Sequence, residues 1–221
     1  MPFITLLLLL LLTQIQSHPV LPTRWISTTK EPGAPGDGVG LEAYKYVDKP
    51  TPDNPSGIWS NYTGCSRLIL INNNYDAKRY LLGCDAVDCC TEQQDGNQLE
   101  FQIPNVHTNF RKIDVKQNSE TINVFGKDVE TDTWTWKFLG QNWTAYTTYD
   151  EEQNPILHRW ETGVLDVIDV SIDFKNFRSI KDEEIKEFDN LFRVPEVCLS
   201  STVQDCGDSV KFEEKNNLVI L

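Results

Sequence analysis

The side chains best suited to acid–base chemistry in this sequence are three histidines, His18, His107 and His158. They are far apart along the chain. A lone histidine is more often structural than catalytic, because a general base needs a positioned partner. The sequence contains no G-x-S-x-G, H-E-x-x-H, glycine-rich phosphate loop or EF-hand spacing. We therefore expect a protein that is not an enzyme, with no catalytic residue to assign.

Clustered carboxylates are the second group that could do chemistry. Acidic runs occupy residues 150–152 and 182–184, and hard oxygen ligands from such loops suit calcium. Both runs are expected in a turn or in the first turn of a helix, where solvated carboxylates have no energetic cost. The main interpretation is a solvated surface, with calcium as an open alternative and no metal ligand or other cofactor assigned.

The six cysteines form the third group, and structural disulfides are their expected role in a secreted chain. They are Cys65, Cys84, Cys89, Cys90, Cys198 and Cys206. A zinc site is disfavoured because the usual C-x-x-C pairs and a nearby histidine are missing. The pairing cannot be chosen from the sequence. Adjacent cysteines point in alternate directions in an extended backbone, so Cys89 and Cys90 are expected to bond different partners.

Residues 1–17 are typical of a signal peptide. An unbroken leucine run at 6–12 is too short to span a membrane, which needs about 20 residues, and the small Ser17 follows it. No other apolar run approaches that length, so no membrane span is expected in the mature chain. The predicted localisation is secreted, with delivery to the lysosome as the alternative.

Two sequons support the same compartment. The net charge limits the classes of partner that the chain can bind. The sequons begin at Asn61 and Asn142, and both are predicted to be glycosylated on exposed turns. The formal net charge of -13 makes nucleic acid or an anionic membrane surface an unfavourable partner.

The rest of the chain divides by composition. Residues 18–57 are rich in proline and glycine and are predicted to form an extended arm, anchored by aromatic residues such as Trp25 and Tyr44. Residues 58–206 are expected to form a single β domain, and 207–221 a polar, poorly ordered tail.

Strand patterns recur about every 10 residues between turns from residue 67 onward, which indicates a mainly antiparallel β protein. Leu99, Phe101 and Ile103 alternate with polar residues, as do Ile168 to Phe174. A helix is predicted over 179–191, with Ser179 and Asp182 as its capping pair.

Aromatic residues gather between 134 and 160. Trp134, Trp136 and Phe138 alternate with polar residues and share one strand face, and Trp143 and Trp160 lie in the next predicted strands. Such a stripe most often fills a core. In a strongly curved sheet it lines a site for an apolar ligand instead, and periodicity does not separate the two.

Several motifs resemble the ependymin-related secreted proteins. The clearest is the Phe-x-x-Pro-x-x-Cys ending at 192–198, which follows a tryptophan-containing strand, an alternating strand and an acidic helix. Weaker matches are Pro22 to Trp25, the apolar strand 68–71 followed by Cys84, and 101–104. The chain departs from the family in lacking a cysteine before Pro155 and in having adjacent cysteines. Family disulfide pairing is therefore not transferred.

The resemblance implies a curved antiparallel sheet, a half-barrel like that of bacterial lipoprotein carriers, with a hydrophobic ligand in its concave face. It also implies glycosylation and calcium association. The candidate lining residues are Trp134, Trp136, Phe138, Trp143 and Trp160. The predicted partner is a lipid or other hydrophobic small molecule. The alternative follows from a similar domain that precedes some lysosomal papain-type proteases: a protein-interaction module that regulates such a protease or another extracellular partner.

Overall fold

The computed structural model describes residues 19, 21–32, 37–71, 77–84, 88–94, 116–138, 141–164, 167–199 and 203–206. Twelve strands of this part form one sheet in the order β12-β6-β5-β4-β3-β2-β1-β11-β10-β9-β8-β7. Neighbours are antiparallel except β12, which pairs with β6 in parallel. The prediction of a mainly antiparallel β protein is confirmed.

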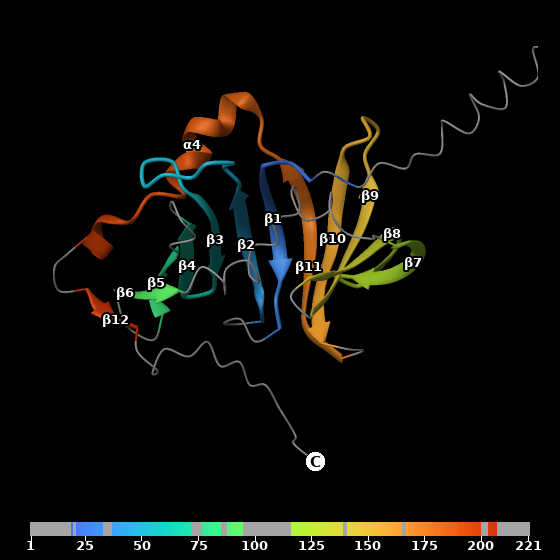
Figure 1. Cartoon of the computed structure of the whole chain (residues 1–221), viewed down its shortest axis with the longest axis horizontal. Helices are drawn as coiled ribbons and strands as arrows, with labels where there is room; N and C mark the ends of the chain where they lie inside the picture. Colours follow the sequence, from blue (N-terminus) through green and yellow to red (C-terminus); the bar gives the residue numbers. More distant parts are fainter. Residues whose placement is uncertain are drawn as a thin grey trace, which may run out of the picture.

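The sheet consists of two meanders joined side by side (Figure 1). The first contains β1 (Arg24–Lys30), β2 (Val39–Lys45), β3 (Ser56–Tyr62), β4 (Cys65–Ile71), β5 (Ala77–Leu82) and β6 (Cys89–Gln94). The second contains β7 (Lys116–Val124), β8 (Lys127–Phe138), β9 (Gln141–Tyr149), β10 (Pro155–Val164) and β11 (Val167–Ser179). They meet where β1 pairs with β11, and β12 (Gln204–Asp205) lies at the far edge.

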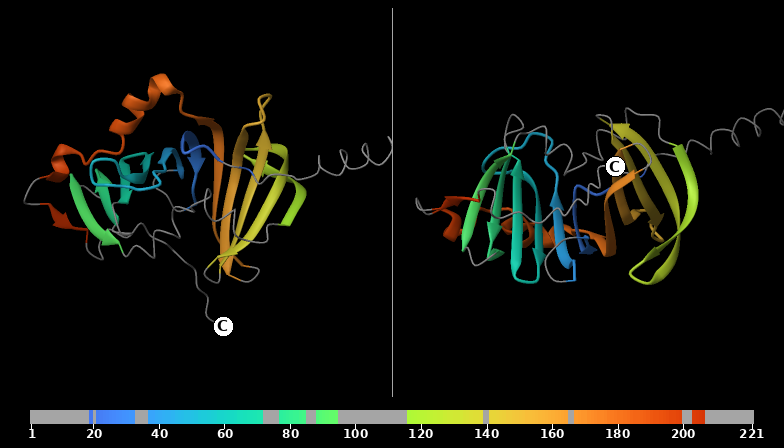
Figure 2. Two further views of the ribbon diagram at one scale, coloured as in Figure 1. Left: turned by 45° about the horizontal axis from the view of Figure 1, so that its top comes forward. Right: turned by 90° about the horizontal axis from the view of Figure 1, so that it is seen from below.

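The sheet is open but strongly curved at the β7 edge (Figure 2). Arg159 of β10 donates a hydrogen bond from Nη2 to the carbonyl oxygen of Asn123 in β7 at 2.7 Å, although β8 and β9 separate these strands in the sheet. The Lys175 ammonium of β11 lies 5.7 Å from the centre of the Phe125 ring. The tip of the β7–β8 hairpin therefore folds back onto β10 and β11, which confirms the prediction of a curved sheet. Arg159 and Lys175 lie on the face opposite Trp160 and Phe174, so at this edge the sheet curves around that face and not around the predicted aromatic lining.

The hairpin can make this tight return because of the conformation at its tip. Val124 pairs with Lys127, which leaves Phe125 and Gly126 as a two-residue turn with φ values of 49° and 79°. Two positive φ values match the right-handed twist of the flanking strands. Gly126 adopts a positive φ without steric strain, whereas the same conformation at Phe125 costs conformational energy.

A short helical segment covers one face of the first meander, here called the helix face. It contains η3 (Asp182–Glu184) and α4 (Ile185–Asn190), with η4 (Glu196–Leu199) further along. Phe188 and Phe192 pack with Ala43, Leu68 and Tyr80 from the strands. The predicted helix over 179–191 is therefore present but shorter.

The predicted capping pair at the start of this helix is wrong. Instead, the backbone N–H of Lys181 donates to Glu184 Oε2 at 3.1 Å. Asp189 then ties the segment to the sheet, since its carboxylate lies 3.2 Å from the buried Lys45 ammonium and 3.3 Å from Arg24 Nε.

All six cysteines form disulfides, as predicted: Cys65–Cys84, Cys89–Cys198 and Cys90–Cys206. The adjacent pair does bond different partners. Cys89 packs in the helix-face cluster, whereas Cys90 belongs to a separate sulfur-rich cluster. The two long-range bonds hold the C-terminal segment against β6.

The prediction of an extended arm over 18–57 is wrong. This segment contributes β1 and β2, which lie at the centre of the sheet, so the β domain begins before residue 58. The prolines at 32, 35, 50, 52 and 55 all fall outside Arg24–Lys30 and Val39–Lys45, so neither strand loses a ladder donor.

Other predictions fall outside the described residues: the signal peptide (1–17), the tail (207–221), the strand at 99–103, and the position of His107. Within the described part, no helix is long and apolar enough to cross a membrane.

Candidate hydrophobic-ligand site

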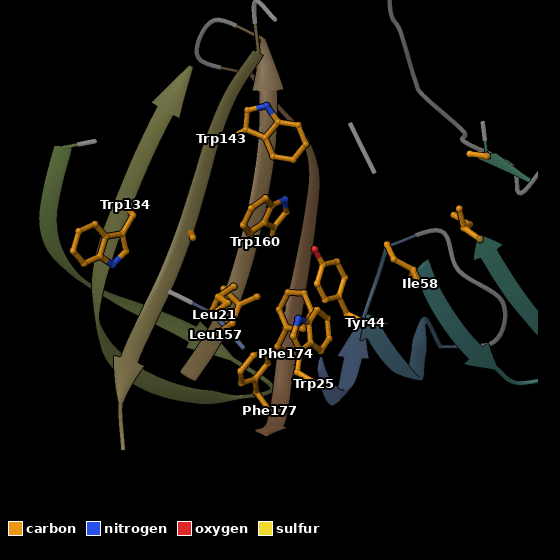
Figure 3. Close-up of a cluster of buried hydrophobic side chains, with 13 residues drawn as sticks. Leu21, Trp25, Tyr44, Ile58, Trp134, Trp143, Leu157, Trp160, Phe174 and Phe177 are labelled. Carbon is orange, nitrogen blue, oxygen red and sulfur yellow. The ribbon is translucent and has the colours of Figure 1, made fainter. Parts of the chain in front are cut away.

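The largest buried apolar cluster extends along one face of both meanders, here called the aromatic face (Figure 3). Its buried members are Leu21, Trp25, Tyr44, Ile58, Ile69, Ala77, Trp134, Trp143, Ala145, Leu157, Trp160, Phe174 and Phe177. Strand register explains why they meet, because directly paired residues share a face: Trp134 pairs with Ala145, and Ala145 pairs with Trp160.

Three of the five predicted lining residues are described and lie in this cluster. Trp134, Trp143 and Trp160 have exposed fractions of 3%, 1% and 6%. The Trp143 and Trp160 rings meet edge to face with centroids 5.5 Å apart. Trp134 donates from Nε1 to Thr147 Oγ1 at 2.9 Å. This part of the face is well packed.

The other two predicted lining residues are described only by their backbone. Trp136 and Phe138 belong to β8, where Trp136 pairs with Trp143 and Phe138 pairs with Gln141. Their side chains lie outside the described part of the chain.

The sequence analysis missed the contribution of β1, β2 and β11 to this face. Trp25 stacks on Tyr44 with centroids 5.4 Å apart, and it also contacts Phe174 and Phe177 at 5.7 and 5.1 Å. The residues Trp25, Ile26, Thr28 and Thr29 all favour strands and were a usable signal. The surrounding prolines and glycines, however, led to the prediction of an arm instead of strands.

The Tyr44 hydroxyl is the polar end of this stacked pair. Tyr44 is 5% exposed, and its hydroxyl oxygen has no hydrogen-bond partner in the described part of the structure. Burial raises the pKa of this phenol well above its usual value, so the group stays protonated.

The aromatic face becomes exposed toward one end of β11. Phe174 is 4% exposed, whereas Val170, which pairs with Thr162 on the same face, is 39% exposed. Ile168 is 59% exposed, but a β-bulge makes it pair with Gly163, which places it on the opposite face. Val164, at the end of the neighbouring β10, is 46% exposed. An apolar row that runs from the core to solvent is suited to contact an apolar molecule.

A charged cluster adjoins the aromatic side chains in the first meander. Glu42 pairs with Ser60, and Ser60 with Arg67. Ser60 donates to Glu42 Oε2 at 3.4 Å, while Arg67 contacts Glu31 at 3.4 Å, and Tyr62 donates to that same carboxylate at 2.6 Å. Burial raises the pKa of Glu42 to about 7, opposed by the charge of Arg67.

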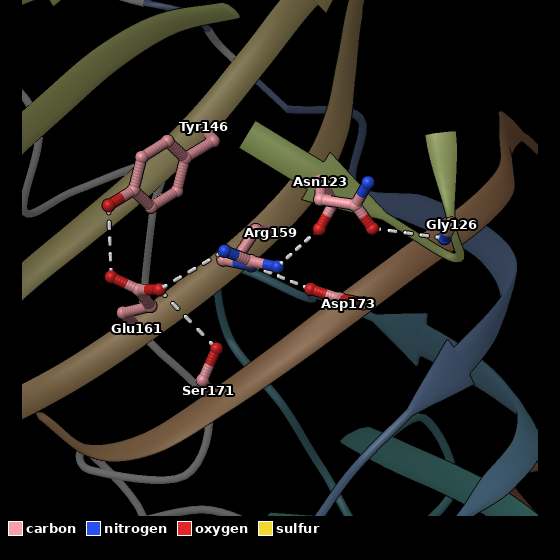
Figure 4. Close-up of polar contacts among 7 residues, drawn as sticks. All are labelled: Asn123, Gly126, Tyr146, Arg159, Glu161, Ser171 and Asp173. Atoms are coloured by element: carbon pink, nitrogen blue, oxygen red, sulfur yellow. Dashed lines mark hydrogen bonds and ion pairs between the residues drawn. The ribbon is translucent and has the colours of Figure 1, made fainter. Parts of the chain in front are cut away.

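A second charged cluster lies on the opposite face of the second meander (Figure 4). Tyr146 and Ser171 donate to the two oxygens of Glu161 at 2.9 and 3.4 Å. Arg159 bonds Asp173 at 2.6 Å and lies 3.7 Å from Glu161. Each carboxylate has a partner, so the cluster is suited to hold strands together.

The remaining candidates for chemistry form no reactive set in the described residues. His158 Nε2 lies 2.8 Å from Thr148 Oγ1, and burial lowers the pKa of this histidine. The Asp150 carboxylate stabilises its own turn, since it accepts hydrogen bonds from Glu152 N, Asn154 N and Asn154 Nδ2. No group of three or more His, Cys, Asp or Glu side chains there is placed to hold a metal ion.

The two sequon asparagines lie in strands and not in turns. Asn61 is exposed, next to the last residue of β3, and its Oδ1 accepts from Ser66 at 3.2 Å. Asn142 is half-buried, the second residue of β9. Glycosylation of either asparagine stays a prediction.

No family model and no curated protein matches the sequence. Among solved structures, the chain is similar to a domain described as an outer membrane lipoprotein-sorting protein from Vibrio parahaemolyticus. That match has 8% identity and a TM-score of 0.37, and covers 77% of this chain and 92% of that one. At this TM-score the likeness carries no argument about what the chain binds.

Proposed function

We propose that this chain is a secreted, glycosylated, non-catalytic protein that binds a lipid or other hydrophobic ligand on its aromatic face. The observation that supports this most is the apolar row that begins in the buried cluster at Phe174 and ends in solvent at Val170 and Val164. A plain core would end where the sheet meets water. This row extends the aromatic surface outward and lets an apolar chain lie along it.

The energetics of such binding are favourable. Each methylene group removed from water contributes about 0.8 kcal/mol, so a long hydrocarbon chain can offset the entropy lost on association. Aromatic side chains also contribute large contact areas with few rotatable bonds. The chemistry needed is contact and desolvation only, which agrees with a non-catalytic role.

The test is native mass spectrometry of the full chain purified from its own source, before and after solvent extraction. The expected result is a mass beyond that of the glycans which the solvent removes and which is identified as lipid. A clean glycoprotein mass, together with no saturable binding of lipid by the delipidated chain, would contradict the proposal.

A matched pair of variants locates the site. Val164→Ser polarises the exposed end of the aromatic face, whereas Val197→Ser changes an equally exposed side chain in η4 (46% exposed in both cases). We expect weaker lipid binding for Val164→Ser and no change for Val197→Ser. Equal affinities for both variants and the unaltered protein would place any lipid elsewhere.

The near-complete burial of Trp134, Trp143 and Trp160 favours a second candidate function, because a plain core has the same property. In that case the chain is a secreted or lysosomal interaction module that regulates a papain-type cysteine protease or another extracellular partner. The discriminating measurement is the activity of such a protease with and without an equimolar amount of this protein. Inhibition without lipid binding would favour this candidate over the carrier.

A further inference from the structure

One polar group on the aromatic face points to the kind of ligand. Tyr44 is only 5% exposed, and its ring stacks on Trp25 in the apolar cluster. Figure 3 shows its hydroxyl directed away from the Trp25 ring, with Trp160 on one side in view and Ile58 on the other.

This hydroxyl differs from those of two other tyrosines in the sheet. The Tyr62 hydroxyl donates to Glu31 at 2.6 Å and the Tyr146 hydroxyl donates to Glu161 at 2.9 Å. In the described part of the chain, the Tyr44 hydroxyl has no hydrogen-bond partner. A buried polar group without a partner is costly, and phenylalanine would fill the same volume without that cost.

The charges on the same face exclude an anionic head group. Arg67 and Arg79 are the cationic side chains that strand register places there among the described residues, and both are ion-paired, with Glu31 and Glu92 respectively. The charges of both guanidinium groups are therefore already balanced, and a buried carboxylate would add a further negative charge near Glu42. An uncharged oxygen has no such penalty and can accept or donate one hydrogen bond to a phenol.

We infer that the Tyr44 hydroxyl is the polar contact for the ligand, which is an uncharged amphiphile with a single hydroxyl or carbonyl head, such as a long-chain alcohol or a monoacylglycerol. This inference rests on the proposed carrier function and specifies its ligand. The hydrocarbon chain lies along the aromatic face and the head completes the hydrogen bonding of Tyr44. Mostly apolar sites in which few polar groups set orientation are typical of small-molecule binding.

The test compares three probes of equal chain length, 1-dodecanol, dodecane and dodecanoate, titrated into the delipidated full chain at pH 7.4. We expect 1-dodecanol to bind most tightly. Tyr44→Phe should lower its affinity about tenfold, as expected for loss of one buried hydrogen bond, and leave dodecane unchanged. Tyr80→Phe, on the helix face, is the matched control and should change none of the affinities.

The possible outcomes distinguish failure of the Tyr44 inference from failure of the proposed carrier function. If dodecane and 1-dodecanol bind equally to the unaltered protein and to Tyr44→Phe, the chain is a carrier but Tyr44 is not its polar contact. Tightest binding of dodecanoate would overturn the uncharged head. If none of the three binds, the carrier function itself fails. A further expected result is that ligand-free Tyr44→Phe unfolds at higher urea than the unaltered protein, because an unpaired buried hydroxyl has been removed.

Discussion

The two charged clusters of this protein contain the same kinds of side chain in different arrangements. Each has one arginine, two carboxylates, one tyrosine and one serine. In the second meander, the Arg159 guanidinium forms ion pairs with Asp173 and Glu161 and a hydrogen bond to the carbonyl oxygen of Asn123. Tyr146 completes that cluster through Glu161. Every strong acceptor there has a donor.

In the first meander, the hydrogen-bond donors are distributed less evenly between the two carboxylates. Arg67 and Tyr62 both contact Glu31, while among the described residues Glu42 accepts a single long bond of 3.4 Å, from Ser60. Burial then raises the pKa of Glu42 to about 7. The comparison shows that composition does not decide whether a buried cluster stabilises a fold. The distribution of donors among the acceptors decides it.

The largest effect on stability is expected from removal of Arg159, the arginine with more ion pairs and hydrogen bonds. Arg159→Leu leaves Asp173 and Glu161 without their cation and releases the β7–β8 hairpin from Asn123. We expect the free energy of unfolding to fall by about 3 kcal/mol, a value at the lower end for a buried pair because the Arg159 side chain is 21% exposed. Urea unfolding at pH 7 measures this, and an unchanged midpoint would show that the hairpin is held by other contacts.

The second prediction concerns the sign of the pH dependence. The folded pKa of Glu42, about 7, lies above its ordinary value of 4.5, so folding favours the protonated carboxyl. This contribution to stability is complete below pH 4.5 and is lost as the pH rises through 7. Glu42→Gln should therefore raise the free energy of unfolding by about 2 kcal/mol at pH 8 and by little at pH 4.5.

Glu161→Gln is the counterpart of Glu42→Gln in the other cluster. Glu161 accepts from Tyr146 and Ser171 and faces Arg159, so loss of its charge should destabilise the protein at pH 8. Urea midpoints of both variants at the two pH values give the comparison. Shifts of the same sign would contradict the difference drawn between the two clusters.

A smaller effect is expected from the tyrosines. Tyr62→Phe and Tyr146→Phe each remove one hydrogen bond to a carboxylate, of 2.6 and 2.9 Å, and should each cost about 1 kcal/mol. Thermal or urea unfolding of the two single variants provides the measurement. Stabilisation by either change would mean that its hydroxyl is as poorly matched as that of Tyr44.

The smallest effect is expected at the surface. Arg178 bonds both oxygens of Glu184 at 2.8 and 2.9 Å, but water screens these side chains. Arg178→Ala should leave the urea midpoint essentially unchanged. A shift approaching that of Arg159→Leu would show that ion-pair geometry outweighs burial in this protein.

Much of the fold was predictable because it depends on local patterns. The apolar strand at Leu68–Ile71 and the helix near Ile185 follow from short sequence patterns, and the divergence of Cys89 and Cys90 follows from backbone geometry. The candidate site was predicted in part. Trp134, Trp143 and Trp160 do come together, but the Trp25–Tyr44 half was missed because proline-rich flanks masked two central strands.

By itself, the sequence determined the class of the protein: mainly antiparallel strands, one short acidic helix, disulfide bonding, and aromatic residues placed on one strand face. These follow from neighbours within a few residues of each other. Tertiary structure decided the rest. The pairing of Trp25 with Ser179 joins the two meanders and makes the aromatic face continuous. It also decided which carboxylate each arginine meets. The pairing of Trp25 with Ser179 spans more than a hundred residues, and the arginine contacts join different strands. Both depend on strand register, which local periodicity does not encode.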